Sequence, residues 1–180
     1  EGFSKESLQG LFGELYFLKN HMIENYGVDV AISSWSGPDE KSKDFSTGST
    51  WYEIKTVGAN VQNVHISSLA QLSSENDGHL VIIRTESMSN EFNNGESSVG
   101  DLFKYVLSKI ENEITESEFL NKLSDSLDES FMAKFQVKSL NLYKVNDKFP
   151  RLTEKDIQQT EICDVSYSLI INSLKPYMEE

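Results

Sequence analysis

Residues 43–56 read KDFSTGSTWYEIKT, and this stretch decides the fold that we predict for the chain. Its second half, WYEIKT, is rich in aromatic and β-branched residues and is typical of a strand. The Ser, Thr and Gly residues at 46–49 are turn formers, so a hairpin should return Asp44 to a place beside Glu53. Side chains alternate along a strand, which puts Glu53 and Lys55 on one face. Two carboxylates and an ammonium group would then share one small patch.

This patch has the composition of a divalent-cation site. Mg²⁺ takes oxygen ligands, usually one or two carboxylates with water completing the shell. Asp44 and Glu53 would supply the carboxylates, and the backbone carbonyl of Ile54 would supply a third oxygen. Lys55 would orient an attacking water or stabilise charge on a phosphoryl group. The spacing D-x₈-E-x-K is a weak signal alone, because Lys55 by itself is better interpreted as a surface ion pair with Glu53.

The segment before the hairpin is predicted to be a helix over residues 4–25. Its apolar residues recur at helical spacing: Leu8, Leu11, Phe12, Leu15, Leu18 and Met22. Glu14 lies among them, either as a solvated flanking residue or as a carboxylate directed at the site. Gly10 and Gly13 lower the helix propensity, which indicates that another element packs closely there.

The rest of the chain alternates between strand and helix patterns. Strands are predicted over 28–35, from 43, and over 51–57, 79–84, 131–145 and 164–171, with a bulge near 138–139. Helices are predicted over 67–74, 99–112 and 115–127, with a short helical segment over 152–157. This order predicts an α/β fold in which helices flank a mixed sheet that begins with a three-strand meander. No repeat or linker divides the sequence, so we expect a single domain over residues 1–180.

Composition bounds the class of protein. The chain has 180 residues, of which 38% are hydrophobic and 25% charged, which fits one globular domain. No apolar run is long enough to span a membrane. The single cysteine, Cys163, excludes an internal disulfide and fits the reducing cytoplasm, where we expect the protein to act. Since the sequence lacks an initiator Met, we expect it to be a fragment of a longer chain.

The net charge of −13 argues against a free-standing, non-specific nucleic-acid binder. It does not exclude a nuclease, because acidic residues on a far surface leave a local groove unaffected. The acidic helices over 111–129 are most simply solvated surface.

Several motifs, together with the order of the elements, resemble the PD-(D/E)xK nuclease superfamily, the fold of many restriction endonucleases. In particular, the chain is similar to the restriction-associated proteins assigned to that superfamily. The matching segments are GLFGELYFL (10–18), W-x-G (35–37), KDF (43–45), YEIKT (52–56), HISSLAQL (65–72), FPRLT (149–153) and DVSY (164–167).

The resemblance implies a restriction-endonuclease-like mixed sheet and a role for five residues. Asp44 and Glu53 become metal ligands and Lys55 the catalytic lysine, and Glu14 becomes a further metal ligand, the additional carboxylate that the first helix often contributes. Gln71 matches a polar residue on the helix after the E-x-K strand, which helps to orient water or DNA. A literal Pro-Asp also occurs at 38–39, but Gly and Pro place it at a turn tip, so we favour Asp44.

The function implied is a Mg²⁺-dependent DNA endonuclease of a bacterial restriction or defence system, with Mn²⁺ able to substitute. The implied partners are DNA, other restriction-system subunits and, by analogy with enzymes that cut two strands, a second copy of the chain. The alternative is a non-catalytic interaction module with the same fold, which the net charge favours. An acid–base enzyme for a small molecule ranks third, because the sequence has neither a cofactor loop nor a nucleophile–His pair.

Overall fold

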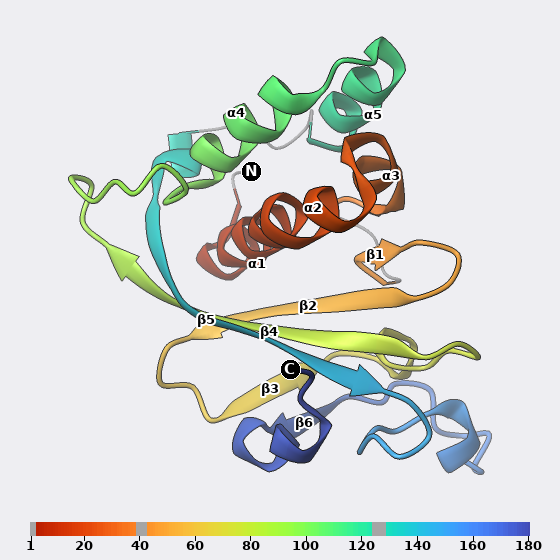
Figure 1. Cartoon of the computed structure of the whole chain (residues 1–180). Helices are drawn as coiled ribbons and strands as arrows, with labels where there is room; N and C mark the ends of the chain where they lie inside the picture. Colours follow the sequence, from red (N-terminus) through yellow and green to blue (C-terminus); the bar gives the residue numbers. More distant parts are fainter. Residues whose placement is uncertain (1–2, 39–42, 124–128) are drawn as a thin grey trace.

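A four-stranded mixed sheet divides the molecule into two layers (Figure 1). We describe it from a computed structural model, in which residues 3–38, 43–123 and 129–180 are described. The strands, in their order across the sheet, are β1 (Phe45–Ser46), β2 (Trp51–Gly58), β4 (Gly78–Met88) and β5 (Lys134–Val145). β2 runs antiparallel to β1 and parallel to β4, and β5 runs antiparallel to β4.

Helices form the layer on one side of the sheet (Figure 1). They are α1 (Lys5–Phe17), which continues through the π-helix η1 (Leu18–Met22) into α2 (Ile23–Tyr26), then α3 (Val28–Ser34), α4 (Val99–Lys109) and α5 (Glu113–Leu123). The helical pattern predicted over 4–25 is therefore confirmed. None of the helices in the described ranges is long and apolar enough to cross a membrane.

The opposite side of the sheet carries a smaller, two-stranded sheet and several short turns. The strands are β3 (Asn63–Ile66) and β6 (Tyr167–Ile170), which pair antiparallel. The 3₁₀ turns are η2 (Leu69–Gln71), η3 (Glu129–Met132), η4 (Glu154–Asp156) and η5 (Ile171–Tyr177). Three of these turns lie on the side of the smaller sheet; the fourth, η3, lies on the helical side, where its residue Phe131 is part of the core.

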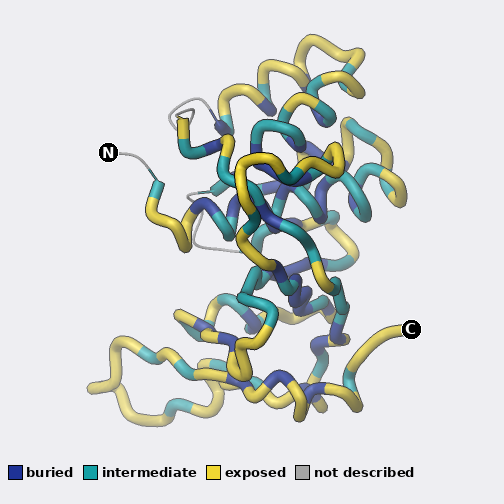
Figure 2. Tube along the Cα trace, turned by 90° about the vertical axis from the view of Figure 1, so that its left-hand side faces the viewer, coloured by how far each residue is buried: buried dark blue, intermediate teal, exposed yellow. Residues whose placement is uncertain are grey.

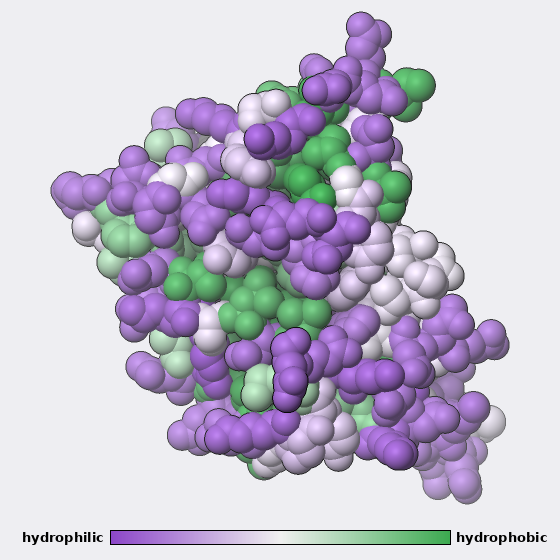
Figure 3. All heavy atoms as spheres, in the orientation of Figure 1, coloured by the Kyte–Doolittle hydropathy of each residue, from purple (hydrophilic) through white to green (hydrophobic). Residues whose placement is uncertain are grey.

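Each layer has its own apolar core. Val81 and Ile83 of β4 belong to the core beneath the helices, whereas Leu80 and Ile82 belong to the core of the smaller layer. This division explains the continuous apolar run in β4, because a strand covered on both faces has no solvated side. Buried residues gather where the layers meet the sheet (Figure 2), and hydrophilic side chains dominate much of the surface above and below the middle (Figure 3).

Helix α1 lies directly against strand β2 at Gly13. A Cβ atom at this position would fall 1.7 Å from Oγ1 of Thr56, so only glycine allows this approach. Gly10 has no such neighbour within 4 Å. The close packing predicted from the two glycines is thus found at one of them.

The strand predicted over 28–35 is wrong, because these residues form helix α3. Gly27, at φ 80°, separates α2 from α3 and lets the chain turn sharply between them. Ala31 and Ile32 are buried whereas Val30 is 47% exposed, so burial follows a helix and not the alternation of Val and Ile in the sequence. Only Trp35 makes a β-bridge, to Phe45, and the predicted three-strand meander is reduced to the β1–β2 hairpin.

The other predicted helices and strands differ from the structure mainly in their bounds. The helix over 67–74 shrinks to η2, strand β3 was missed, and the part of the 115–127 helix beyond residue 123 lies outside the described residues. The bulge near 138–139 is confirmed: Arg84 pairs with Ser139 and Thr85 with Val137, which leaves Lys138 as the extra residue.

Candidate functional site

The β1–β2 hairpin brings Asp44 beside Glu53, as the turn residues predict. Phe45 pairs with Tyr52, so Asp44 comes next to Glu53 in the same register. Oδ2 of Asp44 accepts a hydrogen bond of 2.7 Å from the backbone N–H of Ile54. This contact fixes the carboxylate against the middle of β2.

Glu53 is a buried carboxyl group without enough partners. The residue is 2% exposed, and its nearest cation, Nζ of Lys55, lies 3.5 Å from Oε1. The other oxygen, Oε2, is buried and has no hydrogen-bond partner in the described part of the chain. Burial, and then the neighbouring charge of Asp44, raise the pKa of Glu53 to about 8.

Asp44 and Glu14 share this electrostatic environment. Burial raises the pKa of Asp44 to about 6, although the Ile54 N–H and the Lys55 charge act in the opposite direction. Glu14 of α1 is partly buried, and Nε1 of the buried Trp35 donates a 2.7 Å hydrogen bond to its Oε2. Burial, followed by the charge of Asp44, raises the pKa of Glu14 well above its ordinary value.

Lys55 is held by Gln71. Nζ of Lys55 donates a 2.8 Å hydrogen bond to Oε1 of Gln71, and the backbone N–H of Ser67 donates to the same oxygen at 2.9 Å. Both neighbours are donors, so the acceptor must be the carboxamide oxygen and the side-chain amide has one orientation. Gln71 lies in the turn η2 and not on the longer helix predicted for it.

The five predicted residues therefore come from the β1–β2 hairpin and from two elements that contact its strand β2. The hairpin supplies Asp44, Glu53 and Lys55, η2 supplies Gln71, and α1 supplies Glu14. Within the residues described, however, no group of three or more His, Cys, Asp or Glu side chains is arranged to hold a metal ion. Glu14 is thus linked to the pair through its charge, and not as a third ligand already in place. The rival aspartate at position 39 lies outside the described residues.

The donor set nevertheless fits a hard divalent cation. It consists of carboxylate oxygens, which Mg²⁺ and Mn²⁺ prefer. A buried carboxylate needs a compensating charge, and Lys55 lies at a long distance from Glu53 for that purpose. The orphaned Oε2 of Glu53 and the three raised pKa values all indicate that the ionised site lacks positive charge.

Two residues of the site were missed from the sequence. Trp35 was named only as part of the W-x-G motif, yet its Nε1 donates a hydrogen bond to Glu14; the motif was the sequence signal for it. Lys43 precedes Asp44 directly, and its charge lowers the pKa values of Asp44 and Glu53. Adjacency to the aspartate was the only sequence signal for Lys43.

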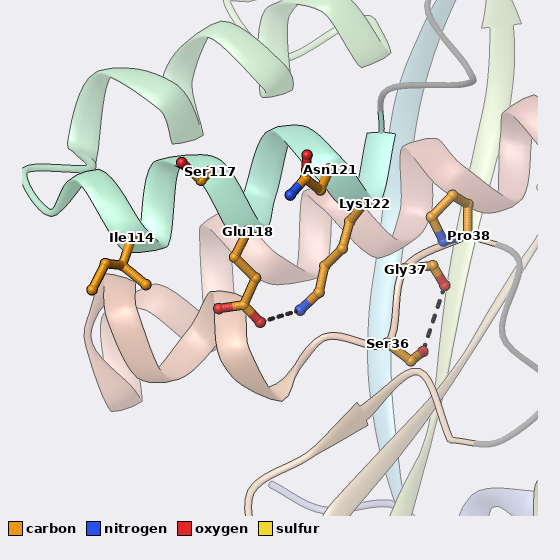
Figure 4. Close-up of a pocket in the computed structure, with 8 residues that line it drawn as sticks. All are labelled: Ser36, Gly37, Pro38, Ile114, Ser117, Glu118, Asn121 and Lys122. Carbon is orange, nitrogen blue, oxygen red and sulfur yellow. Dashed lines mark hydrogen bonds and ion pairs between the residues drawn. The ribbon is translucent and has the colours of Figure 1, made fainter.

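A pocket of about 680 Å³ lies away from these residues, between α5 and the segment after α3 (Figure 4). Its lining residues are Ser36, Gly37, Pro38, Ile114, Ser117, Glu118, Asn121 and Lys122. Nζ of Lys122 already binds the backbone oxygen of Ile32 at 2.7 Å and Oε1 of Glu118 at 2.8 Å. None of the five site residues lines this pocket, so it is not the candidate site.

Comparison with known proteins gives one match. A sequence family described as "Putative PD-(D/E)XK family member, (DUF4420)" matches residues 1–172. Neither a curated protein nor a solved structure matches the chain. The family match covers nearly the whole sequence and includes all five site residues, and the mixed sheet with flanking helices agrees with a restriction-endonuclease-like fold. The chain therefore belongs to this PD-(D/E)XK family.

Proposed function

We propose that the protein is a Mg²⁺-dependent DNA endonuclease that hydrolyses phosphodiester bonds in a bacterial restriction or defence system. The observation that carries the proposal is the buried carboxyl group of Glu53. One of its oxygens has no partner, and Asp44 and Lys55 lie beside it. PD-(D/E)XK nucleases generally use divalent metals, and this arrangement supplies oxygen ligands for one.

Each residue has a distinct part in the proposal. Asp44, Glu53 and the carbonyl of Ile54 would hold Mg²⁺, or Mn²⁺ in its place. The bound ion supplies a water of lowered pKa and stabilises charge on the phosphoryl group. Lys55, fixed by Gln71, places an ammonium group next to Glu53, where it stabilises the negative charge that develops during hydrolysis.

Glu14 acts in this proposal as a third source of negative charge. Its hydrogen bond to Trp35 holds it in the helical layer, and its pKa responds to Asp44, Glu53 and Lys55. Binding of a cation by the pair would favour the ionised form of Glu14. It therefore strengthens cation binding without having to touch the ion.

The net charge of −13 bears on how DNA would reach the site. A phosphate backbone is attracted by Lys and Arg residues, and the chain has 16 of these against 29 Asp and Glu residues. We propose that further basic surface comes from other subunits of the restriction system, with a second copy of the chain as the means of cutting both strands. The cytoplasm is the place where such a system meets DNA.

Plasmid cleavage in the presence of Mg²⁺ or Mn²⁺ tests the proposal. We expect Glu53→Ala and Lys55→Ala each to lower the cleavage rate by about 100-fold or more, because they remove a metal ligand and a charge-stabilising group. The matched controls are Glu86→Ala and Lys138→Ala, which break a half-exposed ion pair of 3.3 Å elsewhere on the sheet. Undiminished cleavage by both site variants would end the proposal.

The second candidate is a non-catalytic interaction module. Two observations favour it: the described residues hold no preformed group of three metal-ligating side chains, and the chain is strongly acidic. Calorimetric titration with Mg²⁺ and Mn²⁺ separates the candidates. The nuclease should bind a cation in a manner that Glu53→Gln abolishes, whereas the module should show no heat that depends on Glu53.

A further inference from the structure

The segment from residue 70 to 77 has little regular structure, yet side chains from elsewhere bind its backbone carbonyls. Nζ of Lys43 donates hydrogen bonds to the carbonyl oxygens of Ala70 and of Ser73, the latter at 2.7 Å. Nη1 of Arg151 donates to the carbonyl oxygen of Leu72 at 2.5 Å. Lys43 and Arg151, which are far apart in the sequence, thus bind three of the four carbonyl oxygens of residues 70–73, around the end of η2.

The β1–β2 hairpin contributes two more contacts of this kind farther along the segment. Nε1 of Trp51 donates to the carbonyl oxygen of Asn76 at 3.0 Å, and Oγ1 of Thr50 donates to that of Asp77 at 3.2 Å. The hairpin that carries the proposed metal ligands therefore also fixes the chain that follows Gln71.

The charged side chains of both Lys43 and Arg151 are largely withdrawn from solvent. Lys43 is partly buried, its Nζ lies 4.6 Å from the centre of the Trp51 ring, and burial lowers its pKa. The side chain of Arg151 is 10% exposed, with Asp147 at 3.6 Å. Withdrawing charge from water is costly, so hydrogen bonds to carbonyls must compensate for it.

The turn itself is short and depends on these contacts. η2 spans three residues and has no side-chain cap at its start. The turn reaches Lys55 through Gln71, whose Oε1 joins Nζ of Lys55 to the backbone N–H of Ser67. A displacement of the turn would therefore release the ammonium group of Lys55.

We infer that Lys43 and Arg151 are positioning residues that hold the turn η2 so that Gln71 keeps Lys55 beside Glu53. The predicted effect of these residues on the cleavage rate rests on the proposed nuclease function. The placement of Gln71 can be tested without that function.

Arg151 gives the cleaner test of the two. Lys43 also lowers the pKa values of Asp44 and Glu53, so its removal would change the carboxyl groups as well as the turn. Arg151 binds the turn, forms an ion pair with Asp147 and lowers the pKa of Lys43. Its charge, however, is not one of those that shift the pKa values of Asp44 and Glu53. Arg84 provides a matched control, because its Nη1 binds the carbonyl oxygens of Gly58, Ala59 and Val61 in a turn that does not carry Gln71.

The experiment compares Arg151→Gln with Arg84→Gln and with the conservative Arg151→Lys. We expect Arg151→Gln to lower kcat by about 10- to 100-fold with little change in KM, whereas Arg84→Gln should leave kcat unchanged. Arg151→Lys should restore part of the rate, since an ammonium group can still donate to the carbonyl of Leu72. Equal loss of kcat in the two Gln variants would show a merely structural role and overturn the inference.

A second measurement follows the turn directly by amide hydrogen exchange of Ser67. Its N–H binds Gln71, so exchange should become about tenfold faster in Arg151→Gln, the loss expected for one hydrogen bond, and stay unchanged in Arg84→Gln. If the wild-type protein cleaves no DNA, the proposed function fails while this measurement still decides the inference. Unchanged exchange at Ser67 in Arg151→Gln would refute it.

Discussion

The two faces of strand β2 differ in whether their buried side chains find suitable partners. On the face toward the helices, Tyr52 and Ile54 are buried among apolar side chains. On the other face, Glu53 is equally buried but keeps an oxygen without a partner, and Lys55 next to it is bound to Gln71. Tyr52 and Ile54 thus stabilise the fold, whereas the buried oxygen of Glu53 lowers its stability.

This difference indicates where selection acted for something other than stability. A buried polar group without a hydrogen bond costs about 1–3 kcal/mol in mutational data. An apolar residue at position 53 would avoid that cost. Local conflicts of this kind are expected at functional sites, where the group has a task that an apolar residue cannot perform.

The packed face gives the largest predicted effect on stability. Gly13→Ala should destabilise the protein by about 2–3 kcal/mol, because the new Cβ would overlap Thr56 and force α1 away from β2. Gly10→Ala, in the same helix but with no neighbour within 4 Å, should stabilise it by about 0.5–1 kcal/mol through helix propensity alone. Chemical denaturation of both variants measures the difference. Equal effects would mean that α1 does not lie against β2 as described.

On the face that carries the site, the buried carboxyl group of Glu53 should make the stability of the protein depend on pH. The pKa of Glu53 rises from 4.5 to about 8 on folding, so between these values the folded state holds a proton that the unfolded state has released. The free energy of unfolding should therefore fall as the pH rises from about 4.5 to about 8. Asp44 contributes in the same direction, but only up to about pH 6.

Glu53→Gln removes this titration while keeping the shape of the side chain. The stability of the variant relative to the wild type should rise by about 2.5 kcal/mol between pH 6 and pH 8.5. Thermal unfolding at a series of pH values, without divalent cations, measures the gain. Parallel curves for the two proteins would show that Glu53 is not a strained carboxyl group, and the contrast between the faces would fail.

A structural feature could be predicted from the sequence when residues close together in the chain determine it, and could not when it depends on contacts between distant residues. The first helix, strands β2 and β4 and the pairing of Asp44 with Glu53 were predictable, because periodicity and turn residues act within a few positions. Residues 28–34 were mistaken for a strand because VDVAISS alternates, whereas in the structure they form helix α3, which packs against α5, some 85 residues away. A pattern cannot report such a contact.

The site divides in the same way. Asp44, Glu53 and Lys55 lie within 12 residues and could be proposed from one stretch of sequence. The hydrogen bond from Trp35 to Glu14 spans 21 residues, and that from Arg151 to the carbonyl of Leu72 spans 79. The burial that raises the pKa of Glu53 comes from the assembled sheet and the layer beneath it. The roles of Trp35, Lys43 and Arg151 therefore became visible only in the structure.

The smallest predicted effect concerns a second buried oxygen without a hydrogen-bond partner, on the face of β2 that packs against the helices. Oγ1 of Thr56 is buried and has no hydrogen-bond partner among the described residues, but a hydroxyl group carries no charge to neutralise. Thr56→Val replaces this oxygen by a methyl group, whose tighter contact with Gly13 offsets part of the benefit, so it should stabilise the protein by at most about 0.5 kcal/mol. The gain should be the same at pH 6 and pH 8.5, as measured by thermal unfolding.

Thr56→Ala is the control for packing, because it removes the same oxygen and also a methyl group that contacts α1, and it should not stabilise. Cleavage activity should be unaffected by Thr56→Val, whereas Glu53→Gln should lose it while gaining stability. Both variants remove a buried orphan from the same strand, three residues apart. If Thr56→Val also lost cleavage, or if its gain changed with pH, the two faces of β2 could not be separate, and the cost at Glu53 could not be assigned to the site alone.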